Sequence, residues 1–135
     1  MVEEHRVIQK GIFLLYLTAV AFLCFGHFES IPQPPEFFLG IPADKIAHFL
    51  MFLPYSILLY ASFRWNTRKW WHSALLAAGL LAAGCITAYM TEVVQGLTSY
   101  RSRDTYDFLA DCMALAVSSI AAYVIDTTQT EKYEK

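Results

Sequence analysis

The side chains of this sequence that could do chemistry occur in three short groups, each at one end of an apolar stretch. Within each group the polar residues recur at intervals of three or four, which places side chains on one face of a helix. The groups are Asp44-Lys45-x-x-His48, Glu92-x-x-Gln95 and Arg101-x-x-Asp104-x-x-Asp107-x-x-x-Asp111. Ionisable residues near membrane segments are costly and usually functional, so the three groups together predict a site.

These residue types suit acid–base or metal chemistry. As catalytic residues, His48 would be a general base or a metal ligand, and Glu92 and Asp111 would orient it or share the metal. A divalent cation is one option, with Asp44, His48 and Asp111 as its suggested ligands, although one histidine with carboxylates does not identify the metal. Asp111 lies a turn deeper than the other carboxylates and must face a partner inside the bundle, because an unpaired buried charge is expensive.

The remaining residues suit substrate binding. Lys45 and Arg101 would hold a phosphate or a carboxylate, and Gln95 and Asp107 complete the substrate-binding set. Glu92 lies in the last turns of its helix, where the macrodipole disfavours an anion. It therefore needs a cationic partner, for which Lys45, Arg101 and Arg103 are the candidates.

Each group also has an ordinary structural explanation. Asp44 follows a proline-rich loop and would serve as the N-cap of the next helix, with His48 hydrogen-bonded to a neighbouring helix. Asp104 would cap the last helix, and Glu92 would form a salt bridge to the following loop. These alternatives stay open at the level of sequence.

The composition is that of an integral membrane protein. The chain has 135 residues, 56% hydrophobic and 16% charged, with a mean hydropathy of +0.39. A soluble domain has about 25% charged residues. The net charge of −2 excludes a basic nucleic-acid-binding surface.

We expect Cys24, Cys85 and Cys112 to be small packing residues, because an odd number of cysteines within apolar spans does not suggest a disulfide framework.

Four apolar segments predict a single all-α domain over 1–135 with four transmembrane helices, at about 11–28, 46–63, 73–95 and 106–125. The loop at 31–43 contains four prolines and the apolar run Phe37, Phe38 and Leu39. It either dips into the membrane as a re-entrant segment or lies on the headgroups. The tail after residue 125 is polar, and we expect it to be frayed.

The distribution of positive charge predicts the orientation. With the N-terminus in the cytoplasm, seven of the ten Lys and Arg residues lie inside and three lie outside. The positive-inside rule favours this arrangement, in which both termini are cytoplasmic and the three polar groups meet at the extracytoplasmic ends of the helices.

Three motifs in the same order resemble the VanZ-like family of small membrane proteins. They are Asp44-Lys45-x-x-His48-Phe49-x-x-Phe52, Thr91-Glu92-x-x-Gln95, and Arg101 followed by Asp104, Asp107 and position 111. The resemblance covers about residues 41–124. It implies a multi-helix domain of the bacterial cytoplasmic membrane, and the family's namesake is linked to resistance to teicoplanin. The family commonly has Asn where this chain has Asp111, and the extra carboxylate would change the local charge.

Two functions fit these observations. In the first, the outward-facing site binds and in an enzymatic version modifies an outer-leaflet amphiphile: a lipid headgroup, a lipid-linked cell-wall precursor or a lipoglycopeptide antibiotic. In the second, the protein is a non-catalytic scaffold whose charges form a salt-bridge network that fixes helix register. The sequence leaves open whether the protein is an enzyme, which cofactor it would use and whether it forms oligomers. A proton-coupled transporter would need polar groups through the full membrane depth, and the cytoplasmic halves of the helices look too apolar for that.

Overall fold

The computed structural model describes residues 2–26, 37–63, 69–99 and 103–133. The described elements are α1 (Val2–Phe25), β1 (Phe37–Phe38), β2 (Ile41–Pro42), α2 (Ala43–Phe52), α3 (Tyr55–Ser62), α4 (Trp70–Gln95) and α5 (Thr105–Tyr133). The predicted all-α class is confirmed, apart from a two-residue antiparallel hairpin between β1 and β2. In this hairpin Leu39 and Gly40 take positive φ angles of 53° and 78°, as tight hairpin turns require.

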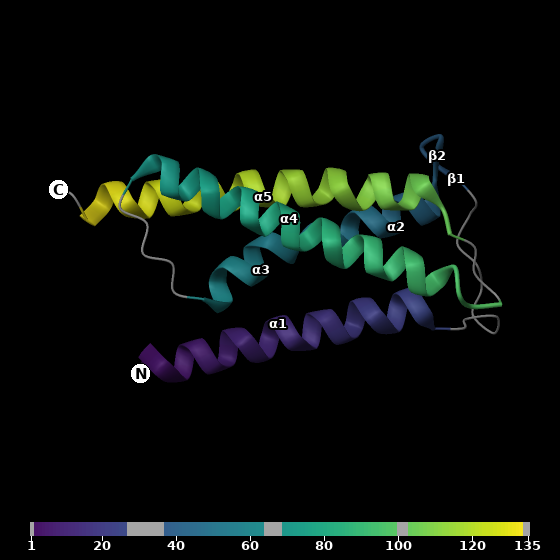
Figure 1. The fold of residues 1–135 in the computed structure, drawn as a ribbon, viewed down its shortest axis with the longest axis horizontal. Helices are drawn as coiled ribbons and strands as arrows, with labels where there is room; N and C mark the ends of the chain where they lie inside the picture. Colours follow the sequence, from purple (N-terminus) through teal and green to yellow (C-terminus); the bar gives the residue numbers. More distant parts are fainter. Residues whose placement is uncertain (1, 27–36, 64–68, 100–102, 134–135) are drawn as a thin grey trace.

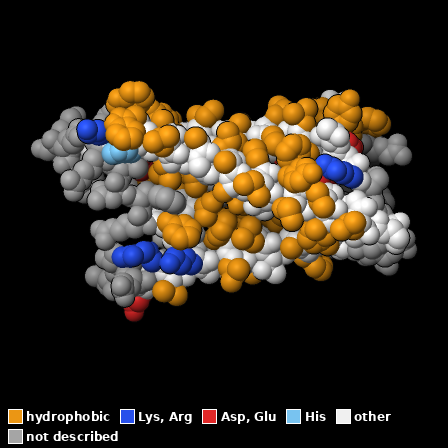
Figure 2. Space-filling view, viewed as in Figure 1, with side chains coloured by type: hydrophobic (Ala, Val, Ile, Leu, Met, Phe, Trp, Pro, Cys, Tyr) orange, Lys and Arg blue, Asp and Glu red, His pale blue; other side chains and the backbone are white. Residues whose placement is uncertain are grey.

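The helices run alternately along one long axis, and both chain termini lie at the same end of the bundle (Figure 1). Four stretches are long and apolar enough to cross a membrane by length and composition: Glu4–Phe25, Ala43–Ser62, Trp70–Gln95 and Thr105–Thr130. Hydrophobic side chains cover much of the visible face along the helices, while the coloured charged side chains lie toward the two ends (Figure 2). This distribution is the one that a lipid-facing surface requires.

The helices extend further than the sequence predicted. α1 begins at Val2 rather than near residue 11, and α5 continues to Tyr133 rather than stopping near residue 125. The expectation of a frayed tail from residue 126 is therefore wrong: Asp126 is a buried helical residue. Polar residues are compatible with a helix once other helices or the aqueous phase receive their side chains.

The second predicted helix is two helices. It breaks at Leu53 and Pro54, because proline has no N–H to donate and its ring clashes with the preceding turn. Side chains from other helices complete the hydrogen bonds at the break. The Ser118 hydroxyl accepts from the backbone N–H of Ser56 at 3.1 Å, and the Tyr16 hydroxyl donates to the carbonyl of Met51 at 2.7 Å. A break inside a membrane span is tolerated when neighbouring helices supply such partners.

An apolar layer fills the middle of the bundle. Phe52, Ala88 and Leu115 are fully buried there. Gly84 allows α4 to approach α5, since a Cβ at this position would lie 2.3 Å from Leu115 Cδ2. Small residues at helix contacts are typical of membrane bundles, where close packing replaces the hydrophobic effect as the driving force.

Ser118→Ala should destabilise the protein, because it leaves the N–H of Ser56 without its acceptor at a buried break in the helix. We expect a loss of about 1–3 kcal/mol, the usual cost of an unsatisfied buried polar group. The measurement is thermal or denaturant unfolding of the purified protein in detergent. Pro54→Ala restores a continuous helix, so Ser118→Ala should cost less in that background.

Ser119→Ala is the matched control, because among the described residues the Ser119 hydroxyl pairs with the hydroxyl of Ser56 at 2.9 Å and with no backbone N–H at the break. Equal effects of Ser118→Ala with and without Pro54 would show that this hydroxyl does not stabilise the break.

Candidate functional site

Polar residues from α2, α4 and α5 meet at the end of the bundle opposite the termini. We call this group the acidic cluster: Asp44, Lys45, His48, Glu92, Asp104, Asp107 and Asp111. The cluster forms because α2 and α5 run in the same direction from this end, so that the first turns of both helices lie side by side (Figure 1).

Lys45 connects α2 to α5 through three carboxylates. Its Nζ lies 2.5 Å from Asp104 Oδ2, 2.5 Å from Asp107 Oδ1 and 2.9 Å from Asp44 Oδ2. The ammonium group has three donors, and the three carboxylates occupy all of them. A phosphate bound by Lys45, as the sequence suggested, would have to displace these carboxylates.

His48 and Asp111 form a buried pair one turn deeper. His48 is 4% exposed and Asp111 is fully buried, with His48 Nδ1 at 3.1 Å from Asp111 Oδ1 and 3.3 Å from Oδ2. An ionised carboxylate can only accept, so the pairing places a proton on Nδ1. His48 Nε2 then faces Asp107 Oδ2 at 3.6 Å. Asp111 meets His48 as expected from the cost of an unpaired carboxylate.

Glu92 is held by a backbone group rather than by a cation. Its side chain is 1% exposed, and Oε2 accepts the backbone N–H of Asp104 at 3.1 Å. Oε1 has no hydrogen-bond partner among the described residues. The expected salt bridge to Lys45 or Arg103 is absent in this part of the chain: Lys45 contacts three aspartates, and the guanidinium of Arg103 lies over the Tyr89 ring, 5.2 Å from its centroid.

Of the two other predicted substrate-binding residues, the structure describes Gln95. Gln95 is buried, and its Nε2 donates to the backbone carbonyl of Cys24 at 3.1 Å, which attaches the end of α4 to the end of α1. Arg101 lies outside the described residues, as does most of the loop whose re-entrant character the sequence left open.

The caps differ from those expected. Asp44 is not the N-cap of α2, because that helix begins at Ala43, its N-cap is Pro42, and no side chain caps it. Asp44 lies in the first turn instead, where an anion still suits the helix dipole. Asp104 caps α5 as expected, since its Oδ1 accepts the backbone N–H of Tyr106 at 2.8 Å.

The structure groups the candidate metal ligands differently from the sequence analysis. The expected set was Asp44, His48 and Asp111. Among the described residues, the sets whose ligand atoms all lie within 4.8 Å of one another are His48, Glu92 and Asp107, and Asp44, Asp104 and Asp107. Asp111 is paired with Nδ1 of His48 instead, and Asp44 forms an ion pair with Lys45.

Buried polar groups also occur in the helix halves near the termini, which were expected to be apolar. Asp126 accepts hydrogen bonds from the Tyr60 hydroxyl at 2.9 Å and the Ser73 hydroxyl at 2.5 Å. The available signal was its position on the stripe that continues from Asp111 through Ser118 along α5.

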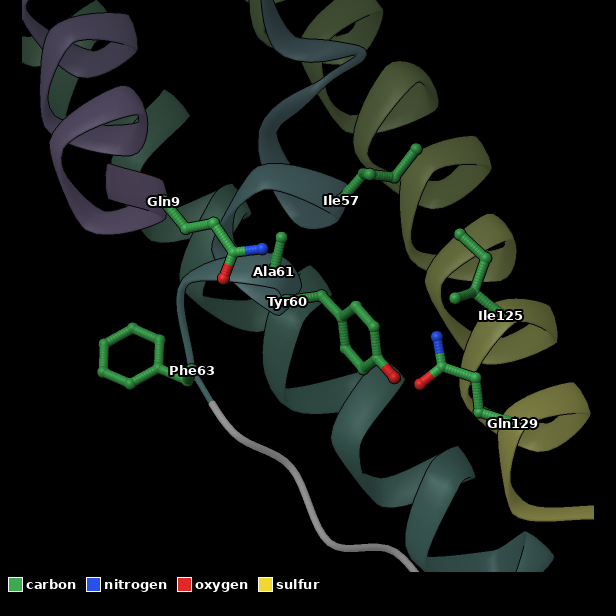
Figure 3. A pocket seen from close by; sticks show the side chains of 7 residues that line it. All are labelled: Gln9, Ile57, Tyr60, Ala61, Phe63, Ile125 and Gln129. Atoms are coloured by element: carbon green, nitrogen blue, oxygen red, sulfur yellow. The ribbon is translucent and has the colours of Figure 1, made fainter. Parts of the chain in front are cut away.

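A pocket of about 360 Å³ lies near the terminal end of the bundle, away from the acidic cluster. It is lined by Gln9, Ile57, Tyr60, Ala61, Phe63, Ile125 and Gln129. The Tyr60 hydroxyl points toward Gln129, and most of the lining is apolar (Figure 3). The candidate chemistry is therefore separate from this pocket.

Comparisons with known proteins leave the family open. No protein-family model matches the chain, and no solved structure matches it significantly. The chain is similar to an uncharacterized protein of Schizosaccharomyces pombe, with 24% identity over 131 residues that cover 95% of this chain and 72% of that protein. Membership of the VanZ-like family therefore stays a prediction.

Asp104→Asn should lower the melting temperature near neutral pH and have little effect in acid. The hydrogen bond from Lys45, together with that from the Tyr106 N–H, holds the pKa of Asp104 below its usual value. The stabilisation is present above the ordinary carboxyl pKa of about 3.9 and disappears as pH falls through the lowered one. Asn retains an N-cap acceptor, so the loss is that of a partly exposed ion pair, about 1 kcal/mol or less.

Unfolding in detergent across a pH series measures this effect. Gln129→Ala removes no carboxylate and should give a difference from the original chain that does not change with pH. A destabilisation by Asp104→Asn that is as large in acid as at pH 7 would contradict a charge effect.

Proposed function

We propose that this chain is a VanZ-like protein of a bacterial cytoplasmic membrane whose acidic cluster faces outward and binds the polar head of an outer-leaflet amphiphile. The candidate amphiphiles are phospholipids, lipid-linked cell-wall precursors and lipoglycopeptides such as teicoplanin. The observation that carries the proposal is the buried His48–Asp111 pair at the end of a membrane-sized bundle, with carboxylates of Glu92 and Asp107 beside the free side of the ring.

The orientation follows from charge and from the arrangement of the ends. Both termini lie at the end of the bundle away from the acidic cluster (Figure 1). The two terminal segments and the 64–69 connection contain seven of the ten Lys and Arg residues. The positive-inside rule therefore supports the proposed orientation, with the termini in the cytoplasm and the cluster outside.

The cluster lies where an amphiphile's head would lie. It is formed by the first turns of α2 and α5 and the last turn of α4, at the ends of stretches long enough to cross a membrane. Next to it in the chain is the β1–β2 hairpin, whose Phe37, Phe38 and Leu39 side chains are exposed. Exposed apolar side chains at that level suit the membrane interface and would contact an acyl chain near its head group.

The arrangement also supports proton transfer. Asp111 fixes the proton on Nδ1 of His48, so Nε2 is the nitrogen available to accept one. A histidine oriented by a buried carboxylate is the arrangement of many general bases. In an enzymatic version of the proposal, His48 would take a proton from a water that attacks a phosphate of the head group, the P–O bond to the leaving alcohol would break, and the proton would pass to that alcohol.

The scaffold function has its own supporting observations. Lys45 joins three carboxylates, and Gln95 links α4 to α1. Such pairing fixes helix register without any ligand. The two functions differ in what His48 and Asp111 should change: ligand affinity in one, and stability alone in the other.

His48→Ala and Asp111→Asn should each weaken binding of teicoplanin at least tenfold, because each removes a group of the buried pair. Such a loss corresponds to one hydrogen bond to a charged group, about 1.5–3 kcal/mol. Calorimetric titration of the protein in lipid nanodiscs measures the affinity. Teicoplanin without its acyl chain is the control ligand, and Gln129→Ala, at the other end of the bundle, is the control variant.

Native mass spectrometry of the protein extracted from mixed phosphatidylethanolamine and phosphatidylglycerol membranes tests the lipid alternatives in the same variants. If folded His48→Ala and Asp111→Asn proteins retain every lipid and antibiotic interaction of the original chain, the binding function is wrong and the scaffold is favoured.

A further inference from the structure

Three side chains of the acidic cluster each use one polar atom in a hydrogen bond within the protein and have a second polar atom that could bind a ligand. Nδ1 of His48 is bonded to Asp111, and Nε2 is the second atom. Oδ1 of Asp107 accepts from Lys45, and Oδ2 is the second atom. Oε2 of Glu92 accepts from the backbone N–H of Asp104, and Oε1 is the second atom. Each residue is therefore fixed in orientation with a lone pair still available.

The three side chains also lie close together. One ligand atom from each of His48, Glu92 and Asp107 can be chosen so that all three lie within 4.8 Å of one another. His48 Nε2 and Asp107 Oδ2 are 3.6 Å apart. Ligands of a zinc-sized cation lie about 2.0–2.2 Å from it, so two ligands on one ion can be up to about 4.2 Å apart. Small side-chain shifts would bring all three groups onto a common cation.

Glu92 provides an independent observation that points to a ligand. Its carboxylate is 1% exposed and lies in the last turn of α4, where the helix dipole disfavours an anion. Among the described residues Oε1 has no hydrogen-bond partner. An unsatisfied buried carboxylate oxygen is expensive, and a bound cation would remove that cost.

The charge of the cluster favours a cation over an anion. Five carboxylates surround one ammonium and one imidazole among the described members of the cluster, and Lys45 is already shared by three of the carboxylates. The other acidic set, Asp44, Asp104 and Asp107, has the Lys45 ammonium at its centre and is satisfied by it. Uncompensated negative charge therefore remains on the side of Glu92 and His48.

We propose that His48 Nε2, Glu92 Oε1 and Asp107 Oδ2 bind a divalent first-row transition-metal ion such as Zn²⁺, with Asp111 positioning the histidine. A carboxylate behind a ligating histidine fixes the ring and raises its basicity, as in other metal sites. The imidazole ligand favours Zn²⁺ and similar ions over Ca²⁺ and Mg²⁺, which prefer oxygen ligands.

The metal site deepens the proposed function and depends on the same cluster. Three protein ligands leave a coordination position open for water or for a phosphate oxygen of a head group. A cation there would let an acidic cluster bind an anionic head even though Lys45 is occupied. His48 would then act as a ligand, and a bound water would provide the base.

Metal binding by the purified full-length chain tests this proposal without any amphiphile. The protein is purified in detergent with a tag that lacks histidine, treated with chelator and titrated with Zn²⁺, and with Co²⁺ as a spectroscopic probe. We expect one equivalent of either ion, a higher melting temperature with Zn²⁺, and a visible Co²⁺ absorption band.

Glu92→Gln and Asp107→Asn keep the size of each side chain and remove the ligand charge, so both should lose most of the affinity and the Co²⁺ band. Asp111→Asn removes only the group behind His48 and should weaken affinity about 10–100-fold. Gln129→Ala changes a residue at the other end of the bundle, outside the acidic cluster, and should bind metal like the original chain.

Two results would overturn the proposal. One is no stoichiometric binding of Zn²⁺ or Co²⁺ by folded protein, as judged by circular dichroism. The other is binding that Glu92→Gln and Asp107→Asn leave unchanged. If folded protein binds no metal but still binds teicoplanin or phospholipid, with the loss in His48→Ala described above, the metal proposal is wrong and the proposed function stands.

Discussion

The polar register between the α2–α3 pair and α5 is the constraint on which the rest of the structure depends. Along two helices that run in the same direction, Lys45 meets Asp107, His48 meets Asp111, Ser56 meets Ser118, and Tyr60 meets Asp126. A buried carboxylate is tolerated only when it is paired. Moving α5 along its axis by one turn would break all four pairs at once. These pairs, which we call the polar ladder, therefore fix the axial position of α5, whereas apolar packing alone would allow other registers.

The break at Pro54 belongs to the same constraint. It exposes backbone groups within a membrane-sized span, and the hydroxyls of Ser118 and Tyr16 satisfy them. Because of the break, the second span needs hydrogen-bonding side chains from both α5 and α1. Between Asp111 and Ser118 on α5, the polar ladder is interrupted by the fully buried apolar side chains of Ala114 and Leu115.

The predictions that succeeded were those that depend on periodicity and composition. Four apolar stretches predicted the four candidate spans, and the spacing of Asp104, Asp107 and Asp111 predicted one stripe whose deepest member needs a partner inside the bundle. The predictions about ion-pair partners did less well. Among the described residues, Glu92 meets neither Lys45 nor Arg103 and is held by a backbone N–H, while Lys45 is shared by three carboxylates and its role in binding a phosphate stays a prediction. Which of several charges meet depends on contacts between residues about 60 positions apart, and local spacing does not encode them.

The sequence by itself determined that the chain forms membrane-sized helices with their ionisable groups concentrated toward the helix ends, because hydropathy and helical periodicity are local properties. It also contained the signals for the break and for the deep carboxylate, Pro54 and Asp126, although their meaning depended on which hydroxyls reach them. Only the tertiary structure decided that Asp111 pairs with His48 Nδ1, that Lys45 is shared by three carboxylates, and that Glu92 Oε1 has no hydrogen-bond partner among the described residues. The physical reason is that the free energy of a buried charge is set by its neighbours within a few ångströms, and those neighbours come from three different helices.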